Sequence, residues 1–179
     1  MKIRLHEIGD EPYVWEVEER IPASALDRPE VLELGPVDWR GEIRPVDPGF
    51  LLRARLSYDQ TLACQRCLAA VTEPVSEEVE LLVLRHDPGA EEEERELQDK
   101  DLGVLVVDGE ELDLAPILLE QIQLNVPMRP LCREECAGLC PTCGADLNQG
   151  PCKCGPRPLD PRWEGLAALR DSLPGGREE

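Results

Sequence analysis

The alternation of apolar and polar residues predicts two long strands near the middle of the chain. Residues 50–63 place one set of apolar side chains on a single face: Phe50, Leu52, Ala54, Leu56, Tyr58 and Leu62. The positions between them are mainly charged or polar, and residues 71–84 alternate in the same way. Only the short segment 64–67 separates the two runs, so we expect an antiparallel hairpin that turns there.

Shorter segments extend this sheet. Residues 104–107 lead into Asp108-Gly109, a dipeptide typical of hairpin turns, so residues 110–113 are expected to pair back with them. The pattern predicts a small, open, barrel-like antiparallel sheet covered by a helix, an α+β fold. Further extended segments are expected at residues 2–8, 13–18 and 37–43, with a helical turn over residues 21–26.

The covering helix is expected to begin after Asp113, a good N-cap, with Pro116 in its first turn and its end before Pro127. Its apolar positions follow helical spacing and consist of Leu114, Ile117, Leu118 and Ile122. A last short helix is expected from Asp160, with an apolar stripe at Trp163, Leu166, Ala167, Leu169 and Leu173. These elements divide the chain into an acidic β-rich body (1–126), a cysteine-rich lobe (127–158) and a short helix with a loose tail (159–179).

The charge of the chain is strongly uneven. Its 179 residues include 19 basic and 38 acidic ones, a formal net charge of −19. Residues 127–179 hold seven basic and eight acidic residues, so the remaining 12 basic and 30 acidic residues lie in residues 1–126. An acidic body repels phosphates, which favours either a basic protein partner or RNA contact confined to the tail. Residues 86–101, with four successive glutamates, are expected to form a solvated acidic loop or frayed helix; a docking strip for a basic partner is the alternative.

The sequence favours a cytoplasmic protein without catalytic activity. No apolar run approaches the roughly 20 residues of a membrane span, and the first 12 residues lack the apolar core of a signal peptide. The chain has no phosphate-binding glycine loop and no Gly-x-Ser-x-Gly motif, and its two histidines, His6 and His86, are isolated. We therefore expect neither a membrane partner nor a small-molecule substrate.

The eight cysteines cluster in two places, and this clustering indicates a metal site. Thiolates spaced two to four residues apart can bind one zinc ion, and the glycine after Cys140-Pro-Thr-Cys143 permits the tight turn of a zinc knuckle. The upstream cysteines are Cys64 and Cys67, and the downstream cysteines are Cys132, Cys136, Cys140, Cys143, Cys152 and Cys154. We expect one or two structural Zn²⁺ ions in a zinc-ribbon-like lobe.

The grouping of these ligands has two solutions. In the first, Cys140, Cys143, Cys152 and Cys154 form one site, and the remaining four cysteines form a second. In the other, the tail holds a single site and Cys64 and Cys67 stay free. Disulfides are not expected, because they would require an oxidising compartment and the sequence favours a cytoplasmic protein. A thioredoxin-like dithiol should open a helix after a strand, whereas Cys64 and Cys67 are expected between two strands.

Several motifs in a fixed order resemble the YceD family, the bacterial proteins named for accumulation of the large-subunit ribosomal RNA. The order is GEIRPVDPGFLLRARL, CQRCL, an acidic middle, ELDLAPILLEQIQLNVPMRPLC, CAGLCPTCGADLN with CKC, and DPRWEGLAAL. The resemblance runs from about Gly35 to Leu173. It implies a role in making or maturing the large ribosomal subunit, with a large-subunit ribosomal protein or pre-ribosomal RNA as partner.

Two other functions remain open from the residues alone. A zinc-ribbon module could bind nucleic acid through Arg129, Arg133, Lys153 and Arg157. A thiol redox protein could use Cys64 and Cys67. The order of motifs favours neither of these but the function implied by the family resemblance: an accessory factor that supports synthesis, processing or accumulation of large-subunit rRNA.

Overall fold

A computed structural model describes residues 1–85, 103–155 and 162 of the chain. The acidic segment expected over residues 86–101 and the last helix expected from Asp160 lie outside the described residues. The chain divides into two compact units, Met1–Cys136 and Ala137–Glu179. Cys132 and Cys136 therefore belong to the same unit as the β-sheet.

The first unit contains an open, curved sheet and one α-helix. Among the described residues, the main sheet has six strands in the order β2-β4-β5-β6-β7, with β3 paired to β5, and a separate two-stranded sheet joins β1 and β8. The strands are β1 (Lys2–Arg4), β2 (Tyr13–Glu19), β3 (Val31–Leu34), β4 (Val37–Val46), β5 (Gly49–Ala63), β6 (Ala70–Leu84), β7 (Val104–Val106) and β8 (Glu111–Asp113). Short 3-10 helices lie at Leu5–Glu7, Ala23–Ala25 and Leu147–Gln149.

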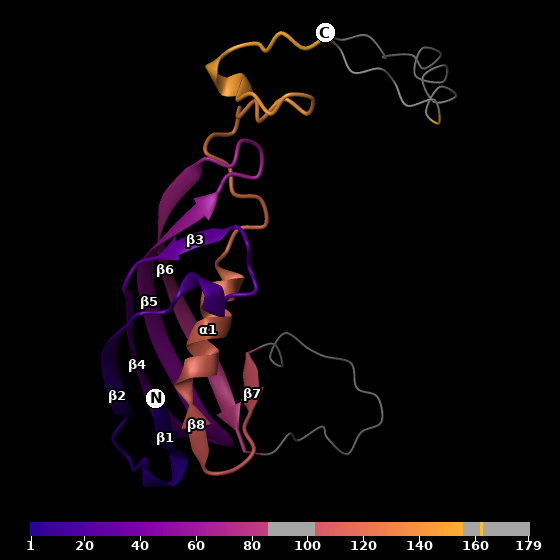
Figure 1. Ribbon diagram of the computed structural model, residues 1–179. Coiled ribbons are helices and arrows are strands. Elements are labelled where there is room, and N and C mark those ends of the chain that lie inside the picture. The colour runs from indigo at the N-terminus through magenta and orange to yellow at the C-terminus, as the bar shows by residue number, and fades with distance from the viewer. Residues whose placement is uncertain (86–102, 156–161, 163–179) are drawn as a thin grey trace. The chain divides into compact units, whose positions relative to one another are not determined.

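The predicted long hairpin is confirmed, and it forms the centre of the sheet (Figure 1). β5 and β6 pair without interruption from Phe50↔Val83 to Ala63↔Ala70. Alternation buries Leu52, Leu56 and Leu62 on the inner face, whereas the outer face carries cross-strand ion pairs such as Arg53 with Glu80. One face of the sheet is thus packed and the other is solvated, as period-two patterning requires.

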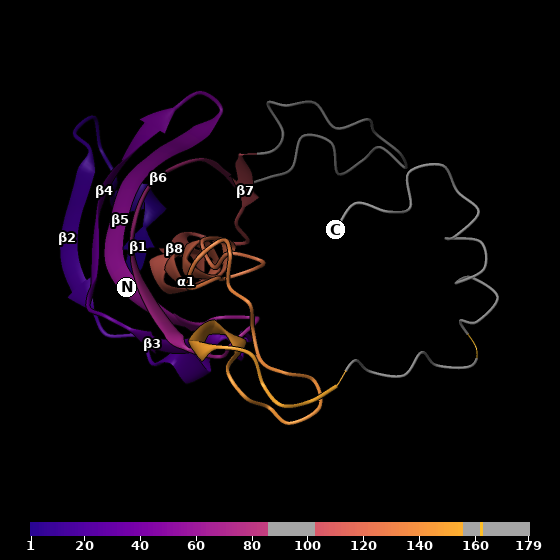
Figure 2. The same ribbon diagram turned by 90° about the horizontal axis from the view of Figure 1, so that it is seen from above.

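The predicted helix α1 (Leu114–Leu124) packs against the inner face of the sheet, which curves around it in Figure 2. The carboxylate of Asp113 caps it by accepting a hydrogen bond from the Ala115 N–H at 3.1 Å. The buried side chains of α1 are those of the predicted stripe, Leu114, Ile117, Leu118 and Ile122. No helix in the described part of the chain is long and apolar enough to cross a membrane.

Two predictions about the sheet are wrong. β8 pairs with β1 instead of turning back onto β7, and β7 pairs with β6 in parallel, so the sheet is not purely antiparallel. The chain does turn at Gly109, where φ is +105°. However, pairing Leu112 with Ile3 leaves them only 2% and 3% exposed, and this tertiary burial outweighs the local hairpin signal.

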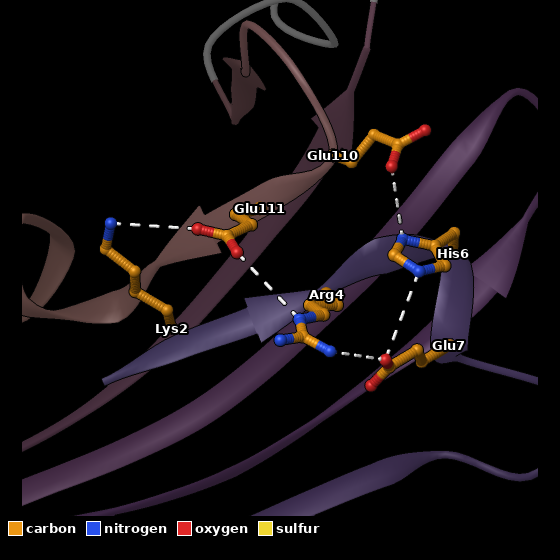
Figure 3. Close-up of polar contacts among 6 residues, drawn as sticks. All are labelled: Lys2, Arg4, His6, Glu7, Glu110 and Glu111. Atoms are coloured by element: carbon orange, nitrogen blue, oxygen red, sulfur yellow. Dashed lines mark hydrogen bonds and ion pairs between the residues drawn. The ribbon is translucent and has the colours of Figure 1, made fainter.

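The β1–β8 pair is surrounded by exposed charges (Figure 3). Glu111 lies 3.7 Å from Lys2 and 3.9 Å from Arg4, and His6 lies 3.4 Å from Glu110. Exposed ion pairs of this kind contribute little to stability. The pairing therefore depends on the buried Ile3 and Leu112. The expected opening strand over residues 2–8 is shorter than predicted, since a 3-10 helix begins at Leu5.

A buried glutamine fixes the end of α1 to the sheet. Gln60 on β5 is fully buried, and its amide donates to Glu73 of β6 at 2.8 Å and to the carbonyl of Asn125 at 3.2 Å. A buried amide left without partners would be unfavourable, so these contacts hold Asn125 in place. The segment that leads from α1 to Cys132 consequently starts at a defined point of the sheet.

Candidate metal centres

Four cysteines from distant parts of the sequence meet at the end of the long hairpin. Cys64 and Cys67 lie in the turn between β5 and β6, and Cys132 and Cys136 lie in the segment after α1. Their sulfurs all lie within 4.8 Å of one another. We call these four residues site 1, and all of them lie in the first unit.

The sulfur separations in site 1 match those expected around one tetrahedral ion. Zinc–sulfur bonds of about 2.3 Å place the sulfurs of a tetrahedral site about 3.8 Å apart. Here Cys64 Sγ lies 3.8 Å from Cys136 Sγ, and Cys67 Sγ lies 3.6 Å from Cys132 Sγ. A disulfide would require about 2.05 Å, and all eight cysteines are free. The site is therefore geometrically able to hold a metal ion.

The hairpin turn holds the segment after α1 by hydrogen bonds to its backbone. The Gln65 N–H donates to the carbonyl of Pro130 at 2.9 Å, and its side-chain amide donates to the carbonyl of Met128 at 2.8 Å. The Arg66 guanidinium donates to the carbonyl of Cys136 at 2.8 Å. The two residues between Cys64 and Cys67 thus orient the other half of the site. Sequence reasoning missed both, because a C-x-x-C spacing carries no information about its intervening residues.

The other four cysteines form a second group within the second unit. The sulfurs of Cys140, Cys143, Cys152 and Cys154, which we call site 2, also lie within 4.8 Å of one another. The Thr142 N–H donates to Cys140 Sγ at 3.4 Å, the kind of backbone contact that offsets thiolate charge. The structure therefore brings the cysteines together in the two groups of four that the spacing suggests, rather than in one tail site.

The two C-x-x-C turns have the same backbone hydrogen bonds. In site 1, Leu68 N–H donates to the Cys64 carbonyl and Cys64 N–H donates to the Ala69 carbonyl. In site 2, the corresponding bonds run from Gly144 N–H to the Cys140 carbonyl and from Cys140 N–H to the Ala145 carbonyl. Distances are 2.8 to 2.9 Å in both turns. Site 1 therefore contains the same knuckle as site 2, although only the site 2 knuckle has the glycine that identifies it in sequence.

Leucine occupies a left-handed position in the first knuckle. Leu68 has φ +62°, close to the +73° of the equivalent Gly144, and its side chain is 66% exposed. A left-handed conformation costs a residue with a Cβ roughly 1–2 kcal/mol. Because little apolar burial is lost, Leu68→Gly should raise the free energy of unfolding by about 1 kcal/mol, measured by urea unfolding with metal bound.

The matched change in the second knuckle should have the opposite sign. A Cβ added at Gly144 meets no atom within 4 Å, so Gly144→Ala tests the backbone effect alone. It should destabilise the second unit by about 1 kcal/mol. If Leu68→Gly instead destabilises the first unit, the Leu68 side chain must contribute packing that outweighs the backbone strain.

Backbone N–H groups favour one thiolate in each group. Burial opposes ionisation of Cys64, but N–H groups of neighbouring residues, that of Cys67 foremost, outweigh it and lower the pKa of Cys64 to about 6. The backbone N–H of Cys143 is the largest contribution that lowers the pKa of Cys140 to about 6. Each site thus has one thiol that ionises readily near neutral pH.

In each site another thiol resists ionisation when no cation lies between the sulfurs. Hydrogen bonding to the sulfur of Cys136 is the main cause that raises the pKa of Cys132 to about 12. The sulfur of Cys143 has the same effect on Cys154, whose pKa also rises to about 12. Several negative charges can share such a small volume only around a divalent cation, which would bind four thiolates. A four-thiolate zinc site leaves no open position for water, so the chemistry of these donors fits a structural metal.

The basic residues considered for phosphate contact are divided between the two units and the residues outside the described part. Arg129 and Arg133 belong to the first unit, Lys153 belongs to the second unit, and Arg157 lies outside the described residues. A basic surface assembled from all four thus has no support from the described residues.

Comparison with known proteins finds a family model over most of the chain. The model for large ribosomal RNA subunit accumulation protein YceD matches residues 52–170. Proteins of Mycobacterium tuberculosis and Mycobacterium bovis, both described as uncharacterized, are each 33% identical over 159 residues, which is 86% of this chain and 70% of theirs.

A plant protein is also similar over a shorter region. Large ribosomal RNA subunit accumulation protein YCED homolog 1, chloroplastic, of Arabidopsis thaliana is 30% identical over 63 residues, 35% of this chain and 20% of that protein. The protein of the same description in Zea mays is 29% identical over 62% of this chain and 44% of that protein. No solved structure matches this chain.

Proposed function

The chain belongs to the YceD family of large ribosomal RNA subunit accumulation proteins, and from this membership we propose that it is a non-enzymatic accessory factor in large-subunit biogenesis. The resemblance inferred from the order of motifs is thereby confirmed. The observation that carries the proposal is the match over residues 52–170, which includes most of the long hairpin and all eight cysteines. We propose that the protein acts in the cytoplasm, where it supports synthesis, processing or accumulation of large-subunit rRNA.

We further propose that both cysteine groups hold structural zinc. The sulfur separations of 3.6 and 3.8 Å in site 1 and the shared knuckle hydrogen bonds support this assignment. Site 1 would join the hairpin to the segment after α1, and site 2 would organise the zinc-ribbon-like lobe. In this arrangement zinc contributes folding free energy and performs no chemistry on a substrate.

The acidic body is the part proposed to meet the partner. Residues 1–126 carry 30 acidic and 12 basic residues, so they attract a basic protein and repel a phosphate backbone. We propose that the body holds such a protein while the ribosomal subunit forms.

Depletion of the protein in its native host tests the proposed role. The amount of large-subunit rRNA should fall relative to small-subunit rRNA, and re-expression of the intact chain should restore the ratio. Gentle affinity purification with and without nuclease then identifies the partner: a large-subunit protein retained after nuclease supports protein contact. An rRNA ratio that stays unchanged on depletion would contradict the proposal.

A further inference from the structure

One edge of the main sheet has no partner strand. Among the described residues, β2 pairs with β4 on one side and with no strand on the other. Figure 2 shows β2 and β7 at the two ends of the curved sheet. A free edge presents a row of N–H and C=O groups that can pair with another extended chain. β2 is seven residues long, enough to accept a strand of ordinary length.

An apolar cavity lies beside this edge. It has a volume of about 390 Å³ and lies between β2 and α1, with Val17, Trp39 and Leu118 among its lining residues. Glu19 and the exposed Ala115 also line it. Trp39 is only 2% exposed, and its indole Nε1–H has no hydrogen-bond acceptor among the described residues. A cavity of this size and lining accepts an apolar side chain.

The second half of the edge strand and the residues just before the strand are acidic. Residues 10–19 contain five acidic residues and no basic residue. Glu16 and Glu18 are exposed on the outer face of β2, and Glu19 lies at the cavity. Pairing β2 with β2 of a second copy would bring these carboxylates together, which is unfavourable. The same charges attract a strand that carries lysine or arginine.

From this edge, cavity and charge we propose a docking site for an extended segment of a basic protein. The segment adds as a strand to the free edge of β2, inserts one apolar side chain into the cavity, and places Lys or Arg opposite Glu16 and Glu18 on the outer face, while Glu19 adds negative charge beside the cavity. Main-chain hydrogen bonds supply affinity and the alternating side chains supply specificity, as in other strand-addition complexes. The identification of that protein as ribosomal rests on the proposed function; the docking surface does not.

Binding of a designed peptide to the full chain tests the surface directly. The probe is a fluorescent ten-residue peptide of alternating valine and lysine; a peptide of the same composition with its lysines grouped together controls for net charge. The alternating peptide should bind more tightly at low salt. It should also slow amide hydrogen exchange in β2. Binding without protection of β2, or no binding, would overturn the proposal.

Two variants measure separately how the acidic side chains and the cavity contribute to peptide binding. Changing Glu16, Glu18 and Glu19 to Gln should weaken binding about tenfold, whereas the same change at exposed Glu33, Glu134 and Glu135 should have little effect.

Ala115→Trp should fill the cavity and weaken binding by a similar factor. Leu124→Trp, at a 69% exposed position of α1 outside the cavity, is its control. Unchanged zinc content and circular dichroism show that each variant is folded.

Two further outcomes would also overturn the proposal. If the β2 amides that face away from β4 are protected in the free chain and removal of residues 156–179 exposes them, the chain covers this edge itself. If sedimentation shows a dimer that the Glu→Gln variant at β2 strengthens, a second copy occupies it.

The rRNA ratio separates this proposal from the proposed function. If depletion lowers the ratio and the β2 variant restores it fully, the biogenesis role stands and the identification of the docked protein as ribosomal is wrong. If depletion has no effect, the peptide and exchange measurements still decide the docking site.

Discussion

Replacing Cys136 with serine is expected to remove one of two zinc ions per chain and to destabilise the first unit by more than about 3 kcal/mol. Cys136 is 2% exposed and its sulfur lies 3.8 Å from that of Cys64, so serine leaves a buried, incomplete site. A structural zinc site contributes on the order of 10 kcal/mol of apparent binding free energy. The loss should therefore exceed that of an ordinary point mutation. Metal content by mass spectrometry and urea unfolding measure the two effects.

Hydrogen exchange locates the damage from this substitution. The turn at Cys64 and Cys67 should exchange faster, because the proposed metal would hold it to the segment after α1 in addition to the hydrogen bonds of Gln65 and Arg66. Cys143→Ser, which should remove the other ion, is the control and should leave this turn protected. Two zinc ions and unchanged unfolding in the Cys136→Ser protein would show that site 1 holds no metal.

Replacing Cys143 with serine is expected to unfold the second unit while the first remains folded. Among the described residues of the second unit, Cys140 is the only buried residue of apolar type, so the lobe has almost no hydrophobic core. Without zinc, its few hydrogen bonds cannot offset the conformational entropy of about 1–2 kcal/mol per ordered residue. Trypsin should then cleave rapidly after Lys153, between two ligands of site 2.

The control for this cleavage is the Cys136→Ser protein, in which site 2 is intact and Lys153 should stay protected. The unfolding transition of the first unit should be the same in the Cys143→Ser and unmodified proteins. Slow cleavage after Lys153 in the Cys143→Ser protein would mean that the lobe is held together by something other than metal.

Local sequence patterns were sufficient to predict the two long strands and the covering helix. Alternation identified β5 and β6, and the N-cap and apolar spacing identified α1, because each of these signals reports directly on which face is buried. The spacing of the cysteines suggested the two groups of four. That zinc occupies them, and the ribbon form of the lobe, remain predictions.

The sequence did not predict which distant strands and side chains contact one another within the fold. Asp108-Gly109 predicted a hairpin, but Leu112 is buried against Ile3, more than a hundred residues earlier, and no local signal reports that contact. Gln60 shares the inner face of β5 with leucines, although its polarity suggests exposure; its partners Glu73 and Asn125 become visible only in the fold. Leu68 conceals the first knuckle in the same way, since glycine is the residue that normally reveals a left-handed turn.

If zinc occupies both sites, the ligand spacing of site 1 affects how the metal is loaded. The facing pairs in site 1 are 65 and 72 positions apart, whereas the ligands of site 2 all lie within residues 140–154. Before the hairpin forms, the four nearest neighbours along the chain are Cys132, Cys136, Cys140 and Cys143, a combination drawn from both native sites. Loop closure costs depend only weakly on loop length, so an unfolded chain would offer zinc this mixed set about as readily as the ligands of site 2. We therefore expect refolding in the presence of zinc to include ligand exchange, whereas zinc added after the sheet has formed should meet the native sets. The timing of metal supply relative to chain folding would then be a kinetic variable of this protein.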